Sequence, residues 1–211
     1  CGRCVADCPY EAVRLVPHSL KGAYRLQAQV NPALCASCGI CAGACPSSTP
    51  FRRAATLVSG IDMPRLPIGA LRQQLDAGLS RLAGAARVVV VGCDCAADVR
   101  SLAAPGVAVF SLPCIGNLPP AFVEYALRRG ASGAGADGVL ITGCREGDCA
   151  YRFGNTWTAQ RLAGAREPHL RRQAQGRRVR MAWAGSGEQA HLARELDAVR
   201  EALASSPAAI A

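Results

Sequence analysis

Residues 35–46 read Cys35-Ala-Ser-Cys38-Gly-Ile-Cys41-Ala-Gly-Ala-Cys45-Pro46, with the cysteines spaced C-x2-C-x2-C-x3-C and a proline directly after the last. Zinc sites usually arrange their cysteines as two separated pairs. An uninterrupted run of four is typical of thiolates that ligate a 4Fe–4S cluster. The small residues Gly39 and Gly43 let the loop turn tightly, so that its backbone amides can point at the sulfurs. The segment therefore predicts an iron–sulfur cluster.

The start of the chain repeats this motif without its first cysteine, reading Cys1-Gly-Arg-Cys4-Val-Ala-Asp-Cys8-Pro9. Two such runs resemble the two-cluster bacterial ferredoxin domain, in which the fourth cysteine of each run ligates the other cluster. The resemblance implies one 4Fe–4S cluster on Cys8, Cys35, Cys38 and Cys41, and a second on Cys1, Cys4 and Cys45. The fourth ligand of the second cluster would lie three residues before Cys1. We expect the natural chain to extend at least that far upstream, with cysteine at that position.

The residues between the two cysteine runs are expected to form a hairpin. The segment Glu11–Val16 and the segment Tyr24–Val30 both look like strands, and the second alternates apolar and polar residues with a period of two. His18 lies between them and is expected to be a solvated turn residue. We predict that residues 1–50 form a small α+β, ferredoxin-like, two-cluster domain.

Residues 51–84 are expected to connect this domain to a second one. The stretch Pro46–Pro67 is rich in serine, threonine, proline and arginine, which is typical of a connector. The stretch Ile68–Ala83 carries leucines at helical spacing, which predicts a helix that packs on a core.

Apolar runs alternate with helical patterns from Arg87 onward. Strands are expected at Val88–Val91, Val107–Leu112, Gly138–Thr142 and Val179–Trp183. Helices are expected at Pro119–Arg129, Thr156–Gln175 (broken near Pro168) and Gly187–Ala204. Strands that are continuously apolar are typical of a parallel sheet covered on both faces. The pattern predicts an α/β parallel-sheet domain over residues 85–205, with about four strands and flanking helices.

The remaining five cysteines follow the predicted strands. Cys93 and Cys95 follow the first, Cys114 the second, and Cys144 and Cys149 the third. The carboxyl ends of parallel strands meet at one edge of a sheet, so these side chains should converge there. Four thiolates suit an iron–sulfur cluster or a zinc ion. Buried free cysteines without a metal are the third alternative.

A family resemblance then becomes specific. The run Gly143-Cys144-Arg-Glu-Gly147-Asp148-Cys149-Ala-Tyr151-Arg-Phe-Gly154-Asn155 and the run that begins Pro113-Cys114 resemble motifs of the delta subunit of methyl-viologen-reducing hydrogenase. The resemblance implies a 2Fe–2S cluster on Cys114, Cys144, Cys149 and one of Cys93 and Cys95. It also implies an electron relay between a hydrogenase or dehydrogenase and a heterodisulfide-reductase-like or quinone-interacting flavoprotein.

Charge and composition exclude several other classes. The formal charge is +9, but thiolate clusters of about −2 each would reduce it to roughly +3, and aromatic residues make up only 5% of the chain. We therefore expect no nucleic-acid partner, and we interpret the arginine-rich run Arg171–Arg180 as a solvated loop and strand start. No apolar run approaches the roughly 20 residues of a membrane span, and no signal peptide is evident. We expect a cytoplasmic protein, at most bound to the cytoplasmic face of a membrane complex.

The sequence offers no catalytic group of its own. It contains no nucleophile–base pattern, and no G-x-G-x-x-G follows a predicted strand. Asp148 is predicted to cap the helix after it, and Asp137 and Glu146 are given no acid–base role. The leading hypothesis is an electron-transfer subunit with two 4Fe–4S clusters and one 2Fe–2S cluster. The alternative is a regulatory or structural module with zinc at the five-cysteine site. A complete flavoenzyme would need residues upstream of Cys1.

Overall fold

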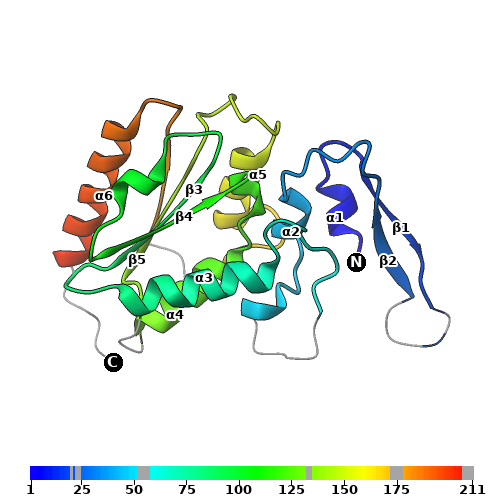
Figure 1. The fold of residues 1–211 in the computed structure, drawn as a ribbon, viewed down its shortest axis with the longest axis horizontal. Coiled ribbons are helices and arrows are strands. Elements are labelled where there is room, and N and C mark those ends of the chain that lie inside the picture. The colour runs from blue at the N-terminus through cyan, green and yellow to red at the C-terminus, as the bar shows by residue number, and fades with distance from the viewer. Residues whose placement is uncertain (20, 22–24, 52–57, 132–134, 172–177, 206–211) are drawn as a thin grey trace.

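The computed structural model describes residues 1–211 apart from 20, 22–24, 52–57, 132–134, 172–177 and 206–211. Figure 1 shows two parts side by side, with the N-terminal cysteine runs and a hairpin in the smaller part and a sheet between helices in the larger. The hairpin lies at the end of the molecule that is farthest from the sheet.

The smaller part contains two one-turn helices and one antiparallel hairpin. The helices α1 (Arg3–Ala6) and α2 (Ile40–Gly43) each follow a glycine with positive φ, 80° at Gly2 and 79° at Gly39. The strands β1 (Val13–Pro17) and β2 (Leu26–Val30) pair antiparallel and confirm the predicted hairpin. Both begin two residues later than predicted, and Tyr24 lies outside the described residues. His18 is an exposed loop residue, as predicted.

The larger part is built on four parallel strands in the order β4–β3–β5–β6. These are β3 (Val88–Cys93), β4 (Val107–Leu112), β5 (Gly138–Gly143) and β6 (Val179–Trp183). Every residue of the two central strands β3 and β5 is buried. Burial on both faces explains why their sequences are continuously apolar. The predicted parallel four-stranded sheet with flanking helices is confirmed.

Helices cover both faces of this sheet (Figure 1). The helices α3 (Ile68–Arg81), α4 (Pro120–Ala131) and α5 (Gly154–Leu162) supply residues to the core cluster that includes Val89, Val91 and Ile141. The helix α6 (Gln189–Ala204) and the 3-10 turn η2 (Val99–Leu102) pack on the opposite face, against Val88, Val90 and Leu140. The result is a three-layered domain with its core on both sides of β3 and β5.

Two local predictions are wrong. The helix predicted over Thr156–Gln175 ends at Leu162, because Gly164 turns the chain with a φ of 82° and the Leu170 amide donates to the Arg161 carbonyl. Residues 172–177 of that prediction, and of the arginine-rich run, lie outside the described residues. Asp148 does not cap the helix, because α5 begins only at Gly154 and its N-cap residue is Phe153, which makes no side-chain cap bond.

The connector contributes a core residue that the sequence did not reveal. The 3-10 turn η1 (Thr49–Phe51) places Phe51 in the core of the larger part, where its ring packs edge-to-face on Phe122 and Tyr125 with centroids 5.6 and 6.1 Å apart. The carbonyl oxygen of Phe51 accepts a hydrogen bond from Arg128. Within the described ranges, no helix combines the length and the apolar character needed to cross a membrane.

Candidate metal centres

Four cysteines of the smaller part line one cavity of about 370 Å3. They are Cys8, Cys35, Cys38 and Cys41. Cys8 lies two residues after α1, Cys35 and Cys38 come from the loop before α2, and Cys41 lies in α2. The apolar side chains of Met63 and Pro64, from the segment before α3, close one side of this cavity.

A second cavity of about 400 Å3 is lined by Cys1, Cys4 and Cys45. Its wall includes Leu26 on β2 and Val58 of the connector, which are 54% and 68% exposed. Four cysteines of the smaller part thus line one cavity and three line the other.

Backbone amides hydrogen-bond to the sulfurs in both cavities. The Ala12 amide lies 3.2 Å from Cys8 Sγ, the Ser37 amide 3.4 Å from Cys35 Sγ, and the Gly60 amide 3.3 Å from Cys45 Sγ. Burial raises the pKa of Cys45, but the Ser47 hydroxyl and the Gly60 amide outweigh it and lower that pKa overall. Such donors stabilise a thiolate, which is the form that ligates metal.

Five cysteines of the larger part gather at the carboxyl edge of the sheet, as predicted. Cys93 ends β3 and lies with its Sγ 3.9 Å from that of Cys144, which directly follows β5. Cys114, which follows β4, and Cys149 both lie against Gly154, and Cys149 packs on the buried cluster that includes Cys114. Cys95 is exposed, and its sulfur faces the Pro113 carbonyl oxygen at 3.8 Å. Cys93 and Cys144 thus form one close sulfur pair, Cys114 and Cys149 share the space beside Gly154, and Cys95 lies outside both groups.

Two residues of α5 shape this edge. The Asn155 side-chain amide donates to the carbonyl oxygens of Cys144 (3.1 Å) and Arg145 (2.7 Å), which fixes the loop after β5. Gly154 packs so closely that an added Cβ would overlap Cys114 Sγ and lie 3.3 Å from Cys149 Sγ. The absence of a side chain at Gly154 thus leaves room for the sulfurs.

The protonation of the sheet-edge cysteines is strongly perturbed. Burial, and then the Cys144 charge, raise the pKa of Cys93 to about 12. The hydrogen bond from Cys114 lowers the pKa of Cys149 to about 5. Buried thiolates that repel one another are stabilised when metal cations bind between them. The donor set and the cradle at Gly154 therefore fit an iron–sulfur cluster. In the described residues, no three His, Cys, Asp or Glu side chains gather around a point in the way that a single metal ion requires.

The first cavity and the sheet edge meet across the boundary between the two parts. Cys38, Ile40 and Cys114 form one buried cluster, and Tyr10, Cys149, Tyr151 and Trp157 pack around it. The 3-10 turn η3 (Ile115–Asn117), which follows Cys114, lies against α2. Residue spacing placed the cysteines within each part but gave no sign of this contact. The aromatic residues around it carried no signal in the sequence.

The fold and these cysteine groups define a class of protein, in which a dicluster iron–sulfur domain precedes a parallel α/β domain with its own cysteine centre. The family model for the 4Fe-4S dicluster domain matches residues 1–49. The family model described as "Methyl-viologen-reducing hydrogenase, delta subunit" matches residues 85–205, more than half of the chain. The chain belongs to this family.

Three curated relatives are iron-sulfur subunits of F420-non-reducing hydrogenases. The one from Archaeoglobus profundus is 34% identical over 95 residues, which are 45% of this chain and 66% of that protein. The vhc iron-sulfur subunit of Methanococcus voltae is 38% identical over 64 residues, 30% of this chain and 41% of that protein. The vhu iron-sulfur subunit of Methanocaldococcus jannaschii is 38% identical over 61 residues, which are 29% of this chain and 42% of that protein. The chain thus spans between about two fifths and two thirds of the length of these relatives.

Proposed function

We propose that this protein is an electron-transfer subunit that carries two 4Fe–4S clusters in its smaller part and one 2Fe–2S cluster at the sheet edge. The observation that carries the proposal is the continuity of the three cysteine groups. Cys38 of the first cavity and Cys114 of the sheet edge share one buried cluster. The second cavity lies in the same small domain and has an exposed apolar rim. When bound, the clusters supply one-electron transfer, and the chain sets their order and environment.

In the smaller part, the two cavities support the crossover assignment. Cys8, Cys35, Cys38 and Cys41 would hold one cubane, and Cys1, Cys4 and Cys45 would supply three ligands to the other. Amides donating to Cys8, Cys35 and Cys45 stabilise the thiolates and favour the electron-rich state of a nearby cluster.

At the sheet edge, the pairing of the sulfurs favours a particular ligand set. Two thiolates on one tetrahedral metal, at about 2.3 Å each, lie about 3.8 Å apart. The 3.9 Å separation of Cys93 and Cys144 matches this value, and Cys114 and Cys149 lie together beside Gly154. Each pair leaves two positions on its metal, which the bridging sulfides of a 2Fe–2S cluster fill. We therefore assign Cys93, rather than the exposed Cys95, as the fourth ligand.

The full chain, purified without oxygen, tests this ligand set by its iron, sulfide and zinc content. Cys149→Ser should lose about two irons and two sulfides per chain, because one ligand pair is broken. Cys95→Ser, the matched control on the same edge, should keep them. Zinc without sulfide at this site would refute the relay and favour a structural module. Equal loss in both variants would refute the assignment of Cys93.

For partners, we propose a hydrogenase- or dehydrogenase-type subunit on one side and a heterodisulfide-reductase-like or quinone-interacting flavoprotein on the other. The similarity to proteins named hydrogenase iron-sulfur subunits supports the first of these. Gentle anaerobic purification from the native source should bring down such an oxidoreductase subunit. Recovery of a monomer alone, fully active with small dyes, would instead indicate a free carrier.

A further inference from the structure

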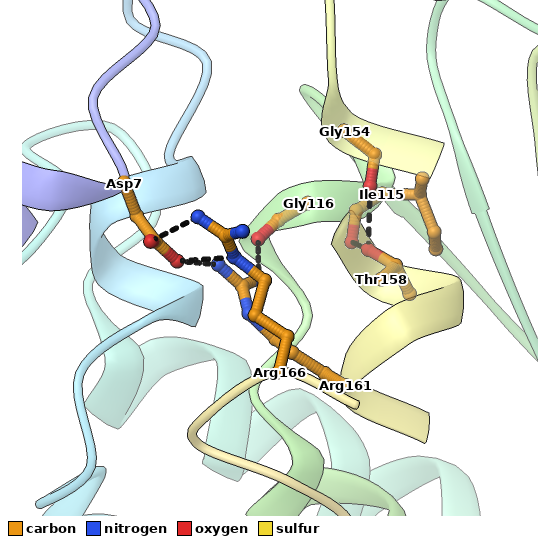
Figure 2. A network of polar contacts seen from close by, with 7 residues as sticks. All are labelled: Asp7, Ile115, Gly116, Gly154, Thr158, Arg161 and Arg166. Carbon is orange, nitrogen blue, oxygen red and sulfur yellow. Dashed lines mark hydrogen bonds and ion pairs between the residues drawn. The ribbon is translucent and has the colours of Figure 1, made fainter. Parts of the chain in front are cut away.

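The boundary between the two parts contains a buried ion-pair network. Figure 2 shows Asp7, from the smaller part, facing Arg161 and Arg166 of the larger part. Arg161 Nη2 lies 2.6 Å from Asp7 Oδ2, and Arg166 Nη2 lies 2.5 Å from Asp7 Oδ1. The side chains of Arg161 and Asp7 are only 1% and 7% exposed. No other ion pair that the structure records in the described residues is buried to this degree on both sides.

This network connects the loops that carry the proposed ligands. Asp7 directly precedes Cys8 in the chain. Arg161 Nη1 donates to the Gly116 carbonyl oxygen at 3.1 Å, and the Gly116 amide lies 3.4 Å from Cys114 Sγ. Arg161 therefore contacts the segment that follows Cys114, while Asp7, the carboxylate it binds, directly precedes Cys8.

Close backbone packing accompanies the ion pairs. An added Cβ at Gly43 on α2 would overlap the Gly116 carbonyl oxygen, and one at Gly39 would lie 2.6 Å from Asn117 Cγ. An added Cβ at Gly116 would lie 2.6 Å from Ile40 Cγ1. Thr158 holds the other side of η3, with its hydroxyl 3.2 Å from the Ile115 carbonyl oxygen (Figure 2). The backbones of α2 and η3 are therefore so close that the two segments can pack in only one arrangement.

A second layer of contacts surrounds the network. The Arg166 guanidinium lies 4.0 Å from the centre of the Trp157 ring, and Trp157 packs on the apolar cluster around Cys38 and Cys114. Arg152 donates to the Pro9 carbonyl oxygen at 2.8 Å and stands 5.0 Å from the centre of the Tyr10 ring. Bonds from the larger part thus reach both neighbours of Cys8, namely Asp7 and Pro9.

The burial of charge needs a physical reason, because an apolar contact of the same size would hold two surfaces together equally well. Removing charged groups from water is costly, and apolar replacements of similar volume are often neutral or stabilising. What an ion pair adds is a fixed geometry, since the planar guanidinium of an arginine donates its hydrogen bonds to a carboxylate in only a few orientations. Electron transfer slows steeply with distance, so a fixed geometry between two cluster sites is useful to a relay.

We propose that Asp7, Arg161 and Arg166 form an interdomain clamp that holds the first cysteine cavity against the Cys114–Cys149 pair, so that electrons pass between these two sites. The three are positioning residues and ligate no metal. This inference rests on the proposed function for its electron-transfer role, but the clamp itself is a property of the protein that can be measured separately.

Hydrogen exchange on the full chain tests the clamp in two variants. Asp7→Asn keeps the shape and removes the charge, whereas Gly43→Ala keeps the charges and adds a methyl that clashes only across the boundary. Either should speed amide exchange in residues 115–118 by about tenfold or more, because the docked arrangement opens more often. Exchange in β3 and β5 should not change. Glu188→Gln, which breaks the Arg145–Glu188 pair on the surface of the larger part, is the matched control and should leave 115–118 unchanged.

A spectroscopic measurement shows whether Asp7 positions the two cluster sites or only stabilises the fold. In the reduced wild type, electron paramagnetic resonance should show magnetic interaction between neighbouring clusters, and Asp7→Asn should weaken it while the iron and sulfide content stays constant. Unchanged exchange in 115–118 in either variant, or an unchanged interaction in Asp7→Asn, would overturn the clamp and leave the proposed function standing. If the wild type holds no iron and sulfide, the proposed function fails, and the exchange experiment still decides whether the clamp exists.

Discussion

Replacing Gly154 with alanine should empty the sheet-edge site without unfolding the protein. Gly154 is the first residue of α5 and has no positive φ, so its backbone accepts alanine. In a helix, alanine is favoured over glycine by up to about 1 kcal/mol. The new methyl, however, would overlap Cys114 Sγ, lie 3.3 Å from Cys149 Sγ and lie 3.4 Å from the Gly116 amide. The Cys114 sulfur is the group that must move.

The expected magnitude follows from these opposing effects. Overpacking a buried site costs about 1–3 kcal/mol, and the helix gain of up to about 1 kcal/mol offsets part of that cost. The free energy of unfolding should therefore fall by at most about 3 kcal/mol, and the domain should stay folded. A displaced ligand sulfur cannot hold its metal, so about two irons and two sulfides per chain should be lost.

The assay compares iron, acid-labile sulfide and the visible spectrum with circular dichroism of the same sample. Gly69→Ala is the matched control, since Gly69 lies in α3 with nothing within 4 Å of an added Cβ. This control should keep all its iron and gain slight stability. If Gly154→Ala keeps the full iron content and spectrum, then Cys114 and Cys149 do not bind metal in the way proposed.

Two further substitutions test the fold around the sites. Phe51→Ala should destabilise the larger part by about 3–5 kcal/mol, since the ring is 2% exposed and packs on Phe122; a loss under 1 kcal/mol in urea unfolding would place Phe51 outside the core. Asp137→Asn should cost about 1 kcal/mol at pH 7, after allowance for partial exposure. Burial raises the pKa of Asp137, but hydrogen bonds from Arg87 lower it overall, so this stability should be present above about pH 4 and should be lost as the pH falls further. The free energies of unfolding of wild type and Asp137→Asn should become equal at low pH, and a constant difference between them down to pH 2 would contradict the ion pair.

Much of the architecture could be predicted from local patterns. The valines of β3 are buried on both faces of the sheet, so their continuous apolar run indicates a central parallel strand. The convergence of Cys93, Cys114 and Cys144 follows from the shared direction of the strands that carry them. Cluster motifs have fixed spacing because one loop surrounds one cluster, and for this reason the cysteine groups in the two cavities could also be predicted.

Other features depend on contacts between distant residues, which spacing does not encode. Asp7 and Arg161 are separated by 154 positions, and each alone looks like an ordinary surface charge. Phe51 lies in a connector of polar composition, and only the completed fold buries it. The end of α5 at Leu162 depends on a turn at Gly164 and on the Leu170 amide, whereas the helical pattern of residues continued beyond that point.

The central claim, a protein that carries electrons on three clusters, is tested most directly by Mössbauer spectroscopy of the full chain reconstituted anaerobically with 57Fe. Two kinds of iron are expected, one from the clusters of the smaller part and a smaller share from a 2Fe–2S cluster, and both should change valence when dithionite is added and recover on oxidation. A single kind of iron with zinc at the sheet edge, or iron that does not change valence with dithionite, would contradict the account.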